Sequence, residues 1–151
     1  MDCIARLVIL LIALLAAGCA ATTPATDTTV AFVDPSDGAA PYSRTVRVGQ
    51  TVYISGVLGS RDGRLVEGGI GPETDQALSN IESALADHGA SLSNIVKCQV
   101  FLADIGEFQA MNDVYKARLQ PPRPARTTVA VDLVAGARIE IDCIAALSET
   151  L

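Results

Sequence analysis

Two segments with helical periodicity, set between runs of strand-like alternation, constrain the fold of this chain most strongly. The first runs from Pro72, which fits a first helical turn, to a stop at Gly89, and its apolar residues recur at helical spacing. The second starts with a capping-box-like pair, Asp104 and Glu107, and its apolar stripe ends at Leu119 before a proline-rich segment. Alternating residues predict strands at 46–48, 51–55, 95–102, 126–133 and 138–146. The predicted order is a hairpin, a helix, a strand, a helix and a closing pair of strands.

The two predicted helices can cover only one face of the predicted sheet. The residues that the alternation assigns to the other face are too apolar for a solvated surface and too mixed for a core: Tyr53, Val57, Phe101, Thr128, Ala130 and Ile144. A surface of this kind usually contacts another subunit. We therefore expect a closed homo-oligomer, with any pocket at the seams between chains.

The N-terminal segment has the pattern of a secretory signal. Residues 7–17 are all apolar and follow Arg6, in a run shorter than the about 20 residues that span a bilayer. Residues 16–19 (AAGC) are similar to the cleavage box of bacterial lipoproteins, so we expect residues 1–18 to be removed and Cys19 to carry a lipid. This predicts a periplasmic protein of the bacterial cell envelope, attached to the membrane only through that lipid. Simple secretion with cleavage near Ala20 or Ala21 is the alternative. Residues 19–37 would form a flexible tether, and residues 38–151 the folded domain.

The charge and histidine content exclude several classes of function. A net charge of −6, without a tryptophan or a basic run, argues against nucleic-acid binding as the main activity. The only histidine, His88, falls in the last turn of the first predicted helix, where an imidazolium would interact favourably with the helix dipole. One histidine without a cysteine cluster supplies neither a zinc site nor a Ser-His-Asp triad.

Cys98 and Cys143 both fall on the apolar parity of a predicted strand. A disulfide between them can form in an oxidising compartment, but it requires Cα atoms within about 7 Å of each other. The sequence does not guarantee that distance. Two buried thiols that pack as small hydrophobic side chains are therefore the preferred interpretation.

Arg126 and Glu140 are the strongest candidates for chemistry, because each lies within a strand-like run rather than in a loop. A guanidinium can bind a carboxylate with two hydrogen bonds, and a nearby carboxylate can hold and polarise a water molecule. Together they suggest a site that hydrolyses a small acid. In the alternative interpretation, Glu140 belongs to an ordinary solvated strand face, and Arg126 pairs with Glu140 or Asp142 in an interface salt bridge.

Seven short segments, in this order, resemble the reactive-intermediate deaminase family, RidA or YjgF. They are PYS at 41–43, YISG at 53–56, LVEG at 65–68, VKCQVFLAD at 96–104, MNDVY at 111–115, PARTTV at 124–129 and IEI at 139–141. The resemblance extends from about Gly38 to Leu147. It implies a chorismate-mutase-like α+β domain, a mixed sheet with two helices on one face, assembled as a homotrimer with sites between neighbouring subunits.

The resemblance also implies a function. Active members of the family hydrolyse enamines and imines, such as 2-aminoacrylate, to a 2-keto acid and ammonia without a metal or an organic cofactor. Arg126 matches the arginine that binds the substrate carboxylate, and Glu140 matches the acid that positions water. Tyr42 matches a pocket tyrosine and is expected to join the catalytic residues, and Asn112, Ser55 and Gly56 match residues that line the substrate cleft. Thr128 is also expected to contact the substrate, but it departs from the family, which often has Cys at that position.

Three further alternatives remain open from the sequence. Tyr42 could anchor a loop, and Asn112 could be a solvated helix residue. At the level of the whole protein, the alternative to an imine deaminase is a non-catalytic trimeric envelope protein that binds small carboxylates or acts like a chaperone. The presence of both Arg126 and Glu140 favours the enzyme, because a binding protein needs only the arginine.

Overall fold

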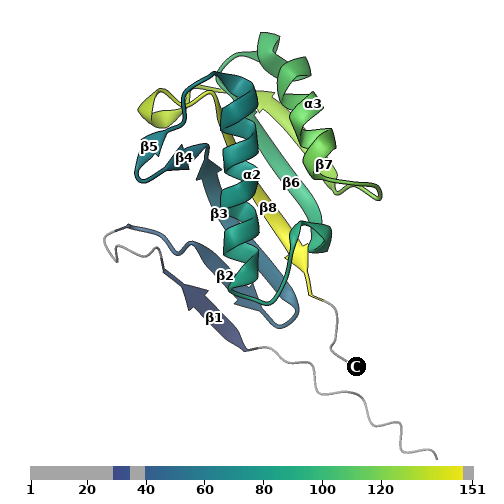
Figure 1. Cartoon of the computed structure of the whole chain (residues 1–151). Coiled ribbons are helices and arrows are strands. Elements are labelled where there is room, and N and C mark those ends of the chain that lie inside the picture. The colour runs from purple at the N-terminus through teal and green to yellow at the C-terminus, as the bar shows by residue number, and fades with distance from the viewer. Residues whose placement is uncertain (1–28, 35–39, 148–151) are drawn as a thin grey trace, which may run out of the picture.

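A six-stranded mixed sheet with two helices on one face forms the folded part of the chain (Figure 1). The structure is a computed structural model and describes residues 29–34 and 40–147. The strand order is β1-β2-β3-β8-β6-β7, and only β6 and β7 run parallel to each other. The strands are β1 (Val30–Val33), β2 (Thr45–Val48), β3 (Thr51–Leu58), β6 (Ile95–Leu102), β7 (Ala125–Ala130) and β8 (Ile139–Ala146), and the helices are α2 (Ile70–Ala86) and α3 (Phe108–Arg118). The predicted fold class is confirmed.

Helix α2 packs along the middle of the sheet because its apolar residues form one stripe. Leu78, Ile81 and Leu85 are fully buried, and α2 contacts both β3 and β8. Ile141 of β8 is fully buried in the same cluster. Burying a side chain of this size contributes about 1.5–3 kcal/mol. The helical stripe seen in the sequence is therefore the centre of the core.

The two helices begin slightly differently from the prediction. Helix α2 starts at Ile70, so that Pro72 lies within its first turn, where a missing N–H removes no helical hydrogen bond. Asp104 accepts a hydrogen bond from the Gly106 amide at 2.8 Å and caps a short 3-10 turn, after which α3 begins at Phe108. Glu107 does not complete a capping box, because its carboxylate binds Arg138 at 2.6 Å.

The last two strands are not neighbours, although the sequence suggested a closing pair. Strand β8 lies between β3 and β6, and β7 lies at the edge beside β6. The reason is burial: Ile139, Ile141, Cys143 and Ala145 are at most 1% exposed, and such a run needs strands on both sides and a helix above it. Strand β7 carries no comparable run and takes the edge.

The N-terminal prediction also changes. Residues 30–33, which were assigned to the tether, form β1 and pair antiparallel with β2. The valines and Phe32 of this segment are typical strand formers. The predicted signal at residues 1–18 and the predicted lipid site at Cys19 lie outside the described residues. Within the part that the structure describes, no helix is long and apolar enough to cross a membrane.

The sheet face opposite the helices is partly apolar, but its composition differs from the prediction. Tyr53 is 48% exposed on this face, and its register partner Ile144 lies beside it. Thr128 pairs with the buried Val100 and therefore faces the helix side, as does Ala130 two residues later. Val57 also turns to the helix side, because the register of β3 shifts between Ile54 and Val57. Of the six predicted residues, Tyr53, Phe101 and Ile144 remain on the open face.

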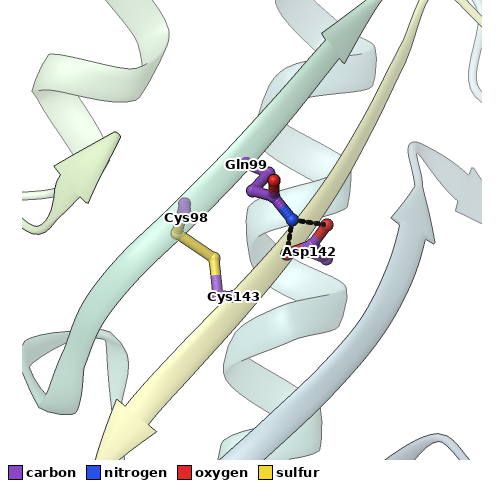
Figure 2. Close-up of a disulfide and its surroundings, with 4 residues drawn as sticks. All are labelled: Cys98, Gln99, Asp142 and Cys143. Carbon is purple, nitrogen blue, oxygen red and sulfur yellow. Dashed lines mark hydrogen bonds between the residues drawn. A yellow bond between two sulfur atoms is a disulfide. The ribbon is translucent and has the colours of Figure 1, made fainter. Parts of the chain in front are cut away.

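Cys98 and Cys143 form a disulfide between β6 and β8, as Figure 2 shows. The two residues are register partners with Cα atoms 4.2 Å apart, and both are buried. The preferred interpretation of two separate thiols is thus wrong, because pairing places the cysteines directly opposite each other. In the same figure, the Gln99 amide donates to both carboxylate oxygens of Asp142, at 3.1 and 3.3 Å.

The surroundings of His88 disfavour its charged form. It follows the end of α2, and its Nε2 lies 2.7 Å from the hydroxyl of the fully buried Thr45. Burial lowers the pKa of His88 below 6.5, Arg47 and Arg44 lower it further, and Asp87 opposes the shift. The imidazolium suggested by the sequence is therefore disfavoured, because desolvation outweighs the attraction of the helix end.

Breaking the disulfide should lower the free energy of unfolding by about 2–4 kcal/mol, because the bond links residues separated by 45 positions and restricts the unfolded chain. The measurement is urea unfolding of the domain with and without a strong reductant. The double variant Cys98→Ala/Cys143→Ala is the control, since its midpoint should not respond to the reductant. A wild-type midpoint that is equally insensitive, once mass spectrometry shows the thiols reduced, would contradict this contribution.

Lowering the pH from about 7.5 to about 5.5 should reduce the free energy of unfolding. The pKa of His88 in the folded state lies below its ordinary 6.5, so acidification protonates the unfolded chain first. The stabilisation is complete above 6.5 and is lost as the pH falls through the folded-state pKa. Urea titrations across this range test the effect. His88→Gln, which keeps an amide near Thr45, should show a flatter dependence, and equal slopes in both proteins would refute the assignment.

Candidate functional site

The end of β3 forms one side of a cavity, because its neighbour β2 separates from it there. Pairing between β2 and β3 begins at Thr45 and Ile54, so β3 continues beyond its partner. The cavity has a volume of about 330 Å³. Its lining residues are Tyr42, Ser55, Gly56, Leu58, Val134 and Glu140. Four predicted site residues thus meet in one place.

Gly56 and Glu140 lie in direct contact in this cavity. A Cβ atom built on Gly56 would collide with the carboxylate of Glu140. Glycine at position 56 therefore allows the Glu140 side chain to lie across β3. The neighbouring Ser55 donates from its hydroxyl to the Ser43 carbonyl at 2.8 Å, and its amide donates to the Arg44 carbonyl at 3.2 Å. These bonds hold the segment that carries the exposed Tyr42 beside the cavity.

Arg126 belongs to a second cluster, built by β7 and α3. Its Nη1 donates to Oδ1 of Asn112 at 3.0 Å, and its guanidinium lies 4.6 Å from the ring centroid of Tyr115 and 5.6 Å from that of Phe108. Phe108, Asn112 and Tyr115 are four and three residues apart, so they share one face of α3. That helix face fixes both the charge and the plane of the guanidinium.

Two buried hydroxyl groups accompany the arginine. Within the described residues, neither the Tyr115 hydroxyl nor Oγ1 of Thr128 has a hydrogen-bond partner. Burial raises the pKa of Tyr115, and the nearby Arg126 opposes that shift. Thr128 is two residues from Arg126 on β7 and faces the same side of the sheet. The cluster therefore combines a partly satisfied cation with two polar atoms that can accept or donate further bonds.

The two clusters lie on opposite faces of the sheet. Cys98 is the register partner of both Arg126 and Cys143, so all three side chains point to the helix side. Glu140 is three residues before Cys143 on β8 and therefore points to the other side. Arg126 and Glu140 do not share a cavity in one chain. The alternative salt bridge of Arg126 with Glu140 or Asp142 would lie at an interface between chains. Among the described residues of one chain, Asp142 binds Gln99 instead.

Several residues of these clusters could not be identified as site residues from the sequence. Tyr115 and Phe108 were assigned to the core stripe of the second helix, although their rings hold Arg126. Their spacing from Asn112 was the available pattern: a polar residue within an apolar stripe at helical positions. Val134 and Leu58 could not be identified, because the backbone path alone brings them to the cavity. Within residues 29–34 and 40–147, no three metal-binding side chains are grouped closely enough to hold an ion.

Comparisons with known proteins agree with this architecture. Residues 34–147 match the sequence family described as Endoribonuclease L-PSP. The 2-iminobutanoate/2-iminopropanoate deaminase of Capra hircus is 48% identical over 108 residues, 70% of this chain and 79% of that protein. The crystal structure of RidA from Psychrobacter sp. PAMC 21119 is similar with a TM-score of 0.69 and 38% identity, covering 72% of this chain and 90% of that one.

A further relative corrects the predicted location. Protein mmf1 of Schizosaccharomyces pombe is 41% identical over 111 residues, 71% of this chain and 68% of that protein, and its name places it in mitochondria. The prediction of a periplasmic, lipid-attached protein of the bacterial envelope is therefore wrong. A short apolar N-terminal run was the basis of that prediction, and such a run does not by itself specify a compartment.

Gly56→Ala should displace the Glu140 carboxylate from the cavity, because the added methyl group overlaps it. The free energy of unfolding should fall by less than about 1 kcal/mol, because the flexible end of the glutamate side chain can move away. A crystal structure and urea unfolding of the variant provide the test. Gly71→Ala is the matched control, since its methyl group would meet only Val114 at 3.9 Å. An unmoved Glu140 at full stability would show that position 56 does not need glycine.

Proposed function

We propose that this chain, which belongs to the Endoribonuclease L-PSP family, the RidA/YjgF proteins, is an imine deaminase. It hydrolyses 2-imino acids of the 2-aminoacrylate type to 2-keto acids and ammonia. The names of relatives such as the deaminase of Capra hircus support this activity. At residue level, the proposal rests on the positions of the candidate groups. Glu140 lines the cavity on one face of the sheet, and Arg126 belongs to the cluster on the other face.

The division implies that a complete site needs two copies of the chain. One copy supplies Arg126, Asn112 and Thr128, and the next supplies Glu140 with the cavity at the end of β3. We propose a closed homotrimer, in which each seam joins one cluster of each kind. The exposed apolar residues of the open face, such as Tyr53, support burial against another subunit.

Arg126 orients the substrate in this proposal. One guanidinium nitrogen already binds Asn112, and the ring of Tyr115 fixes the plane of the group. The remaining N–H groups can bind the carboxylate of a 2-imino acid through two parallel bonds. A substrate held in this way presents its C=N carbon in a fixed direction, which converts the attack of water into a positioned step. The hydroxyl groups of Thr128 and Tyr115 can complete the binding of the carboxylate.

Glu140 positions the water molecule on the other side of the substrate. The protonated imine is already electrophilic, so attack requires only that the water be oriented and lose a proton to the carboxylate. Water adds to the C=N carbon as Glu140 takes one of its protons, and Glu140 passes that proton to the amine nitrogen. Glu140 then accepts the remaining hydroxyl proton as the C=O bond forms and the C–N bond breaks, which releases ammonia. Gly56 leaves the space in which the Glu140 side chain lies. An enamine enters the same sequence after protonation of its carbon to the imine.

The competing function is a trimer that binds small carboxylates without catalysis. The cationic cluster alone would suffice for binding, whereas the cavity beside Glu140 would then have no role. Cleavage of RNA, which the family description names, is not favoured by the net charge of −6, because a polyanion would be repelled. Tight binding of pyruvate without faster imine hydrolysis would favour the binding protein.

Arg126→Ala should lower kcat/KM for 2-iminopropanoate about 100-fold or more, because two charge-assisted hydrogen bonds are lost. The imine is generated in the assay by an amino-acid oxidase, and the release of keto acid is followed above the spontaneous rate. Arg126→Lys keeps the charge but not the planar fork, so it should restore only part of the activity. Unchanged activity in Arg126→Ala, with the assembly intact by sedimentation, would remove the arginine from the mechanism.

Mixing two inactive variants tests whether the site is shared between copies. Arg126→Ala and Glu140→Gln should each be nearly inactive, but oligomers refolded from an equal mixture should recover about a quarter of wild-type activity, since a quarter of the seams then join two intact clusters. Each variant refolded on its own is the control and should stay nearly inactive. No recovery in oligomers shown by mass to be mixed would place both groups in a site within one chain.

A further inference from the structure

A second cavity continues from the one beside Glu140. It also has a volume of about 330 Å³, and it shares Tyr42, Ser55, Gly56 and Leu58 with the first. From these common residues it extends to helix α2. The residues found only in this second cavity are Arg44, Val57, Ser60, Asn80 and Ser83. The two cavities therefore form one trench around the free end of β3, with Glu140 at one end and α2 at the other.

The trench changes in character along its length. Its middle is lined by the Tyr42 ring and by the aliphatic side chains of Val57 and Leu58. Both polar atoms of the Asn80 side chain, on α2, already have partners within the protein. Its amide donates to the carbonyls of Leu58 at 3.1 Å and Ser60 at 2.8 Å, and its oxygen accepts a bond from Gln76. At the α2 end of the trench, the side chains that keep polar groups for a ligand are Arg44 and Ser83.

Arg44 is fixed in position but keeps unused donors. Its Nη1 donates to Asp87 at 2.8 Å and its Nη2 to the hydroxyl of Ser83 at 3.0 Å. A guanidinium carries five N–H groups, and only these two bonds from Arg44 are found among the described residues. Its charge is balanced by Asp87. This end of the trench therefore presents hydrogen-bond donors without a net positive charge.

We propose that the α2 end of the trench is a subsite for the side chain of the imino acid, and that it selects an uncharged side chain ending in a hydrogen-bond acceptor, such as a carboxamide. The methylene groups of such a side chain pass the apolar middle, and its carbonyl oxygen accepts bonds from Arg44. A second carboxylate is disfavoured, because Asp87 already neutralises the arginine and would repel it. This inference rests on the proposed function, since it extends the site that contains Glu140.

The test compares two imines of equal length. Imines are generated in the assay from glutamine, methionine and alanine by an amino-acid oxidase, and ammonia release is measured above the rate without the protein. Glutamine and methionine have side chains of similar reach, but only glutamine ends in a carboxamide. We expect kcat/KM for the glutamine-derived imine to exceed that for the methionine-derived imine about tenfold, the effect of one or two hydrogen bonds to a charged group.

Two variants locate this selectivity. Ser83→Leu fills the α2 end, so the ratio of kcat/KM between glutamine- and alanine-derived imines should fall at least about tenfold, whereas Ser83→Ala, which adds no volume, should keep most of that ratio. Arg44→Leu should remove the preference for glutamine over methionine, and Arg44→Lys should restore part of it. A wild-type protein that accelerates no imine refutes the proposed function. If the alanine-derived imine is accelerated but the glutamine-to-alanine ratio of kcat/KM is the same in wild type and Ser83→Leu, the subsite is refuted and the proposed function is not.

Discussion

The central position of β8 determines how the rest of this molecule is arranged. Its alternating residues bury Ile139, Ile141 and Cys143 under α2, and the same alternation turns Glu140 to the opposite face. Strand β7 is then displaced to the edge beside β6, and its register places Arg126 on the helix side. One constraint, burial of a strand on one face, thus separates the two groups that the proposed reaction needs. In the proposed mechanism, this separation is the reason why a complete site would need a second copy of the chain.

One stripe of residues on helix α3 both packs in the core and holds Arg126. Met111 is fully buried in the core, while Phe108, Asn112 and Tyr115 hold the guanidinium of Arg126. A cation held against aromatic rings and one amide loses little further freedom when it binds a carboxylate, so more of the interaction energy appears as affinity and orientation. The arrangement explains why a helix of the core also belongs to the candidate site.

The free end of β3 provides the other half of the proposed site. Because β2 leaves β3 near Ile54 and the register against β8 shifts before Val57, this part of the strand has an exposed edge bordered by α2 and by the segment of Tyr42. Gly56 admits the carboxylate of Glu140, and the cavity continues beyond it toward Arg44. In the proposed enzyme, the 2-imino acid group that all substrates share and the variable side chain would occupy different stretches of one trench.

Most of the helices and strands, and the candidate residues for chemistry, could be predicted from the sequence. Periodicity identified both helices and the main strands, because burial of one face imposes a spacing on apolar residues, and the short segments around Tyr42, Arg126 and Glu140 indicated the family. Periodicity does not record which strands pair. The three-dimensional arrangement was needed to see that Cys98 lies opposite Cys143 in a disulfide and that Thr128 faces the helices. It was also needed to see that Arg126 and Glu140 point to opposite sides of the sheet. Those facts depend on register and strand order, which arise from contacts between residues far apart in the chain.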